Sequence, residues 1–177
     1  FEALPPLGVT CLRFNFRGVE ASTGVHDHGR GERDDASAAL GVLASEVEPA
    51  TALLVAGWSF GGDVTLSLLD DRVRAWLAIA PALRSATDTG AVASDPRRKH
   101  LVLAEHDEVR APAEIQAEVA SWQATTLEIV PGVTIGDVAT VSEVTQQVSI
   151  TRVDGNQAAT ITADITSENT GGVSAEV

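Results

Sequence analysis

Several residue types are scarce or missing in this chain of 177 residues, and each gap excludes a class of protein. The single cysteine, Cys11, cannot form an internal disulfide, so a disulfide-stapled domain is excluded. No stretch approaches the roughly 18 apolar residues that cross a bilayer, and the first residues lack the pattern of a signal peptide. Twelve basic against 25 acidic residues give a net charge of -13, which disfavours nucleic acid and anionic membranes as partners. We therefore expect a soluble, cytoplasmic globular protein.

Methionine is absent altogether, and the chain opens at Phe1, so we expect it to be an internal piece of a longer protein. The composition changes at Pro131: every leucine, aromatic residue and histidine comes before it. After it, Thr and Val alternate with other residues over 144–150 and 159–165, a pattern typical of half-buried strands. The sequence therefore predicts two parts, residues 1–131 and a β-rich tail over 132–177.

The first part alternates short apolar runs with helical patterns. Nearly continuous apolar runs such as 51–57 are typical of buried parallel strands. Strand and helix in succession predict an α/β fold, with an incomplete, mostly parallel sheet covered by helices on both faces. The expected strands are 9–16, 51–57, 73–80, 100–104 and 126–130, and the expected helices are 32–48, 60–70 and 112–123.

The motif with the clearest chemistry is Gly-Trp-Ser-Phe-Gly-Gly at 57–62, directly after one predicted strand and directly before a predicted helix. In this context Gly-x-Ser-x-Gly predicts a nucleophile elbow, a strained turn that exposes the Ser59 hydroxyl. Gly57 and Gly61 leave room for the tight turn, and the Phe60 N–H is placed to donate to an oxyanion. The alternative is a glycine-rich connection in a parallel sheet without chemistry.

Residues 1 to about 131 resemble the α/β-hydrolase superfamily, in particular its dienelactone-hydrolase-like or predicted-esterase branch. This resemblance implies a serine hydrolase of ester, lactone or thioester bonds, with Ser59 as nucleophile and Asp107 as the acid that orients the base. It also implies no cofactor and a small-molecule ester-type substrate. Glu20 stands where that family usually has glycine. The resemblance depends on the stretches 12–18, 22–24, 57–62, 79–81, 101–107 and 111–112.

A triad base is missing at its usual place. In this fold the chain order is Ser, acid, His, but no histidine follows Asp107. His26, His28, His100 and His106 all precede the acid, and none is favoured as base from its sequence position. The strands before residue 9 and the loop that normally supplies a second oxyanion donor are also absent. We therefore predict an impaired or inactive enzyme, because a serine without its base is a poor nucleophile.

The tail resembles a different family. Residues 133–141 and 149–159 are similar to the porter domain of resistance-nodulation-division efflux transporters, where a Gly-Asp-Val-Ala turn precedes an Arg-x-Asp-Gly segment. This implies a natural, artefactual or engineered fusion near Pro131, a non-enzymatic fragment as the alternative function, and a periplasmic alternative location. A generic Thr/Val-rich β segment is the simpler interpretation.

No metal site is expected. His26-Asp27-His28 near Asp34 and Asp35 contains ligand-type side chains, but no further ligand has a fixed spacing to them, so a polar surface loop is the better interpretation. Because an incomplete sheet exposes an edge, we expect that the chain can associate with itself through an unpaired strand.

Overall fold

The computed structural model describes residues 3–86, 88–138, 149–151 and 158–164. In this part of the chain a seven-stranded sheet has the order β5-β4-β3-β2-β7-β1-β6. The strands are β1 (Val9–Asn15), β2 (Leu53–Trp58), β3 (Val73–Ile79), β4 (Arg98–His106), β5 (Thr125–Thr134), β6 (Ser149–Thr151) and β7 (Ala158–Asp164). The helices are η1 (Pro5–Leu7), α1 (Arg30–Glu46), α2 (Phe60–Thr65), α3 (Thr89–Ser94), α4 (Pro112–Val119) and α5 (Ile135–Val138).

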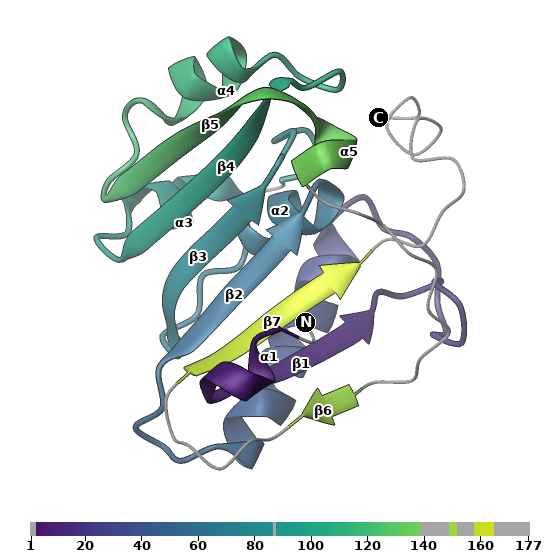
Figure 1. Cartoon of the computed structure of the whole chain (residues 1–177). Helices are drawn as coiled ribbons and strands as arrows, with labels where there is room; N and C mark the ends of the chain where they lie inside the picture. The colour runs from purple at the N-terminus through teal and green to yellow at the C-terminus, as the bar shows by residue number, and fades with distance from the viewer. Residues whose placement is uncertain (1–2, 87, 139–148, 152–157, 165–177) are drawn as a thin grey trace.

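The sheet is mostly parallel, as predicted. Neighbouring strands from β5 to β1 all pair in parallel, and the short β6 pairs antiparallel with β1. The connection from β1 through α1 to β2 skips one place in the sheet, and β7 occupies that place between them (Figure 1). A tail strand is therefore part of the same sheet as the first half of the chain.

The core lies between the sheet and its helices. Along β2, Leu53 and Val55 are buried while the side chains between them are half-buried, as the two-residue period of a strand requires. Leu40 and Leu43, one helical turn apart on α1, are fully buried in the same cluster. Trp76 of β3 is also buried, and its indole N–H donates to the Leu68 carbonyl at 2.9 Å.

Several elements differ from the expectation. Helix α2 ends at Thr65 instead of residue 70, where Ser67 N and Leu68 N donate to the carbonyls three residues back, at 3.0 and 3.2 Å, instead of four. Helix α3 was not predicted, and β5 continues past Pro131, which an edge strand tolerates. The boundary predicted at residue 131 thus falls inside β5 and stays a prediction.

The tail strands match the predicted ones only in part. The strand predicted over 159–165 corresponds to β7, whereas of the one predicted over 144–150 only the end overlaps β6. Residues 144–148 lie outside the described residues.

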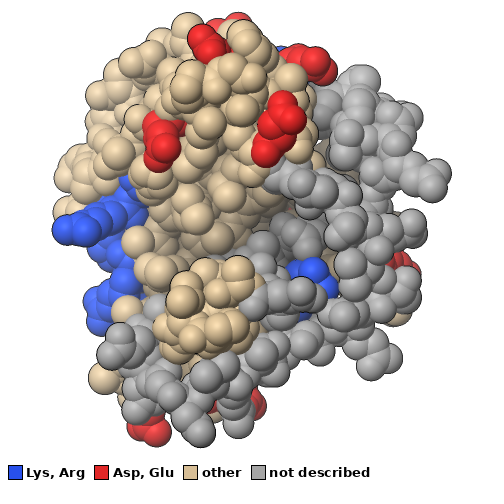
Figure 2. Space-filling model, in the orientation of Figure 1, with Lys and Arg blue, Asp and Glu red and all other residues tan. Residues whose placement is uncertain are grey.

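The surface carries charge unevenly. In the view of Figure 2 basic side chains gather at the left, on the side where β3 and β4 begin, and acidic side chains are spread over the rest of this face. Among the described residues, no helix has both the length and the apolar character needed to cross a bilayer.

Candidate active site

The carboxyl ends of the parallel strands meet at one edge of the sheet. Ser59 follows β2, the loop 80–85 follows β3, and Asp107 follows β4. Since β3 pairs with both β2 and β4 in the same direction, these three segments share that edge. In open α/β sheets this edge is where ligands bind.

Ser59 has the backbone conformation of a tight strand-to-helix turn. Its φ of 51° and ψ of -118° lie outside the regions that L-residues normally occupy. Two backbone hydrogen bonds hold it there: Ser59 N donates to the Ile79 carbonyl at 2.8 Å, and Asp63 N donates to the Ser59 carbonyl at 3.1 Å. Such strain persists only where the surroundings determine it, and it concentrates at functional sites.

The glycine at position 57 is required by close packing. A Cβ on Gly57 would overlap the carbonyl of Gly61 in the next helix turn and crowd the Thr65 hydroxyl. Strand β2 and helix α2 therefore approach each other more closely than any other residue at 57 permits. Only glycine at position 57 is compatible with this contact beside Ser59.

Asp63 anchors the loop after β3. Its side chain is buried, and its carboxylate accepts hydrogen bonds from the N–H groups of Leu83, Arg84 and Ser85 at 2.7–2.9 Å. Burial raises the pKa of Asp63, although these N–H groups act in the opposite direction. The loop includes Leu83 at φ 55°, a strained position that this carboxylate holds in place.

Asp107 is engaged by its own turn. Its Oδ1 accepts hydrogen bonds from Val109 N at 2.8 Å and Arg110 N at 3.1 Å. The Arg110 guanidinium in turn donates to the Ala82 carbonyl at 2.8 Å, which links the Asp107 turn to the loop after β3. His106 ends β4 with an exposed side chain. The structure thus places Asp107 at the edge that Ser59 shares, two strands away, with β3 between β2 and β4.

His26 lies near the same edge of the sheet, in the loop between β1 and α1. The His26 ring lies 5.1 Å from the Phe60 ring, centroid to centroid, and 4.9 Å from the His28 ring. His26 Nδ1 lies 2.8 Å from Glu32 Oε1, and the Glu32 side chain is fully buried. The sequence analysis interpreted His26 as part of a polar surface loop, and this proximity to the elbow was missed.

Glu32, the third residue of α1, holds the loop in this place. Glu32 accepts hydrogen bonds from Asp27 N and Gly29 N, both at 2.8 Å, so it caps the start of α1 and folds the loop back. In the described part of the chain, no three His, Cys, Asp or Glu side chains lie close enough together to hold a metal ion.

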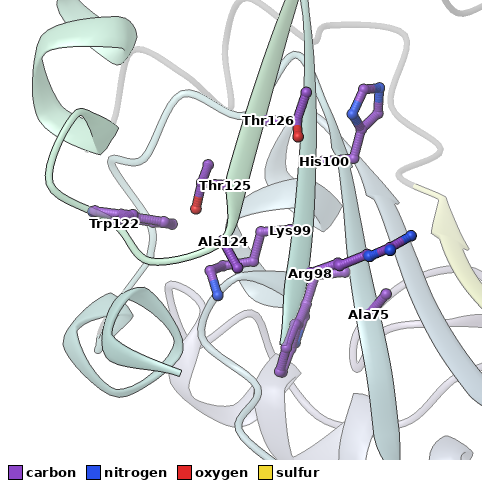
Figure 3. A pocket seen from close by; sticks show the side chains of 9 residues that line it. Ala75, Arg98, Lys99, His100, Trp122, Ala124, Thr125 and Thr126 are labelled. Carbon is purple, nitrogen blue, oxygen red and sulfur yellow. The ribbon is translucent and has the colours of Figure 1, made fainter. Parts of the chain in front are cut away.

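The opposite edge of the sheet holds a cavity of about 670 Å³. It lies where β3, β4 and β5 begin, and Figure 3 shows Lys99 on one side of β4 and Arg98 and His100 on the other. The Lys99 ammonium donates to the carbonyls of Asp95 and Arg97, and burial lowers its pKa. His100 faces Glu128 at 3.3 Å. This cavity is separated from Ser59 by the length of the strands.

The environments of Cys11 and Trp58 can also be described. Cys11 is buried within β1, and burial raises the pKa of its thiol. Trp58, beside the serine, is half-buried, and its indole nitrogen is buried without a hydrogen-bond partner among the described residues.

Comparisons with known proteins agree with the fold. No protein-family model matches the chain. The uncharacterized protein RP471 of Rickettsia prowazekii is 39% identical over 87 residues, which is 48% of this chain and 37% of that protein. An alpha-beta serine hydrolase homologue from Coxiella burnetii has a TM-score of 0.61 at 24% identity. XC6422 from Xanthomonas campestris, a lidless member of the α/β serine hydrolases, has a TM-score of 0.60 at 28% identity.

Both structural matches cover 68% of this chain, but the chain covers only 58% and 55% of theirs. It therefore spans less than two thirds of the relatives it resembles. The chain has the fold of the α/β-hydrolase superfamily.

Proposed function

We propose that this chain is a serine-hydrolase-like protein that acts on ester, lactone or thioester bonds through Ser59, with low turnover. The observation that carries the proposal is the backbone of Ser59, strained at φ 51° and ψ -118° between a buried parallel strand and a helix. Gly57 keeps that turn tight, so the hydroxyl is held where the strand ends. This is the arrangement of a nucleophile elbow.

In the proposed reaction the Ser59 oxygen attacks the acyl carbon and gives up its proton to a base. The Phe60 N–H donates a hydrogen bond to the oxyanion that forms. The bond to the leaving alcohol or thiol then breaks, the leaving group takes the proton, and water releases the acyl group from Ser59. The sequence resemblance implies Asp107 as the orienting acid, and its carboxylate accepts hydrogen bonds from Val109 N and Arg110 N.

Turnover is expected to be low because no residue from 108 to 177 is a histidine, whereas in this fold the base follows the acid along the chain. The two structural relatives, a serine hydrolase homologue and a lidless member of the α/β serine hydrolases, support the reaction class.

The test is covalent labelling of Ser59. A fluorophosphonate probe, read by intact-protein mass and peptide mapping, should label the wild type at Ser59 and leave Ser59→Ala unlabelled. Slow hydrolysis of a short-chain p-nitrophenyl ester should be lost in the same variant. Ser45→Ala is the matched control, since Ser45 is an outer residue of α1 whose hydroxyl bonds only to its own helix at Val42. A wild type that resists the probe, or a Ser59→Ala variant that still reacts, would contradict the proposal.

The alternative function, a non-enzymatic fragment of an efflux porter, gains no support from the described part of the tail. Strand β7 pairs along its whole length with β1 and along most of it with β2, in parallel. It therefore completes the sheet that carries Ser59. The porter resemblance stays a prediction from the sequence.

A further inference from the structure

We propose that His26, oriented by Glu32, is the general base for Ser59. The inference rests on the proposed function of Ser59 and names a catalytic residue that this function needs. Three observations carry it: the contact of His26 with Phe60, its pairing with a buried carboxylate and the path of its loop.

The contact with Phe60 brings the imidazole to the elbow. Phe60 follows Ser59 in the chain and opens α2, and its ring packs edge-on against Phe16 at 5.7 Å while His26 lies tilted against it at 5.1 Å. The aromatic packing from β1 therefore fixes Phe60, and Phe60 fixes the position of the imidazole. His26 thus contacts the residue that follows Ser59 in the chain.

The path of the loop supports the same placement. A Cβ on Gly29, which has φ 93°, would overlap the Ser85 carbonyl, so the loop before α1 touches the loop after β3. Strand β2 lies between β1 and β3 in the sheet. A loop that starts after β1 and touches the loop after β3 must therefore pass the end of β2, where Ser59 lies.

Glu32 gives His26 the environment of an oriented base. The Nδ1 atom is 2.8 Å from Glu32 Oε1, so the carboxylate can accept a hydrogen bond from an Nδ1–H. With a proton on Nδ1, the second nitrogen, Nε2, is the ring atom left to accept the Ser59 proton. Glu32 is fixed by the N–H groups of Asp27 and Gly29, so the imidazole is held by a rigid partner. A carboxylate that fixes the tautomer in this way is what a serine-activating histidine requires.

The proton balance is simple. Nε2 accepts the Ser59 hydroxyl proton as the oxygen attacks the acyl carbon, and the resulting imidazolium is stabilised by Glu32. When the bond to the leaving group breaks, Nε2 returns the proton to that group. The same nitrogen then takes a proton from the water that attacks the acyl-serine and gives it to the Ser59 oxygen as the acyl group leaves, which restores the serine and the neutral imidazole. Glu32 keeps its charge throughout and acts as a positioning residue.

The test compares rates of Ser59 acylation by a short-chain p-nitrophenyl ester, followed as the mass of the acylated protein. General-base catalysis contributes about 100-fold to 10,000-fold, so His26→Gln should acylate at least about 100-fold more slowly than the wild type. Its side chain is 43% exposed, so the substitution should leave the thermal unfolding unchanged. His100→Gln, at the opposite edge, and His28→Gln are the matched controls and should acylate at the wild-type rate.

Chemical rescue separates a catalytic from a structural role. His26→Gly should regain Ser59 acylation when free imidazole is added, whereas His28→Gly should show no gain. Glu32→Gln should slow acylation at least about tenfold, since it no longer fixes the reactive tautomer. The slower acylation of Glu32→Gln should be seen at a temperature at which the unfolding curve of this variant shows that it is folded.

The outcomes separate the two proposals. If the wild type is never acylated at Ser59, the hydrolase function itself is wrong and the base assignment goes with it. If the wild type is acylated but His26→Gln keeps the wild-type rate, or if His28→Gln shows the loss instead, the function stands and the assignment of His26 is overturned.

Discussion

On the β1 side of Ser59 a buried carboxylate contacts an imidazole, whereas on the β4 side the Asp107 carboxylate accepts hydrogen bonds from N–H groups of its own turn. The first side is built from a capped helix and packed aromatic rings, with Glu32 fully buried. The second is held through Arg110, whose partners Glu114 and Glu118 are 63% and 38% exposed. The comparison teaches that the position of an acid along the chain does not decide which side of the elbow supplies the base.

Asp63 connects the two sides, and removing its carboxylate should have the largest effect on stability. Asp63→Ala leaves the part-buried N–H groups of Leu83, Arg84 and Ser85 without their acceptor, and the loss of such an acceptor costs about 1–3 kcal/mol where the donor is shielded from water. We expect a fall of about 4 kcal/mol in the free energy of unfolding, measured by urea denaturation. Asp34→Ala, which removes an exposed carboxylate from α1, should change it by less than about 0.5 kcal/mol. Equal stability of the two variants would show that the loop after β3 does not depend on Asp63.

The elbow itself was predictable from the sequence, and its surroundings were not. Gly57, Ser59 and the flanking strand and helix are neighbours in the chain, so local sterics define the turn. The position of β7 is not local: alternation of Thr and other residues predicts a strand but not its partners, and β7 lies between β1 and β2. We assigned this segment to a separate tail because the composition changes at Pro131. Composition does not show which strands pair with each other.

The His26 site could not be predicted for a related reason. His26 and Phe60 are far apart in sequence, and their contact depends on how Glu32 folds the loop onto the start of α1. A glutamate near a helix start is a common capping residue, and on its own it does not indicate that a histidine will meet it. Only the packed rings of Phe16 and Phe60 show where that histidine lies.

On the β1 side, the stabilisation that the Arg17–Asp35 ion pair gives to the fold should decrease in acid. Burial acts to raise the pKa of Asp35, but the hydrogen bonds from the Arg17 side chain and N–H outweigh it and hold the pKa below its ordinary value of 3.8. A carboxyl whose pKa is lower in the folded state stabilises the fold above its unfolded pKa, and this contribution is lost as the pH falls through the folded pKa.

Asp35→Asn should therefore lower the melting temperature by about 2–4 °C at pH 7, and the difference from the wild type should shrink progressively below pH 4. Thermal unfolding followed by circular dichroism over a pH series measures this. The neighbouring variant Asp34→Asn controls for the loss of one negative charge. A difference that stays constant down to pH 2 would show that the pair does not stabilise the loop through its charge.

Substitution of a charged residue on the β4 side should have the smallest effect on the free energy of unfolding. Glu118 lies 2.6 Å from the Arg110 guanidinium, but its side chain is 38% exposed, and ion pairs in such positions contribute about 0–1 kcal/mol. Glu118→Gln should therefore change the free energy of unfolding by less than about 0.5 kcal/mol, and the change should disappear in 1 M salt. The Asp107 turn should keep its geometry, because Arg110 still donates to the Ala82 carbonyl and Arg110 N still donates to Asp107. If Glu118→Gln costs more than about 2 kcal/mol in urea denaturation, the β4 side is held as firmly as the β1 side, and the contrast between them is wrong.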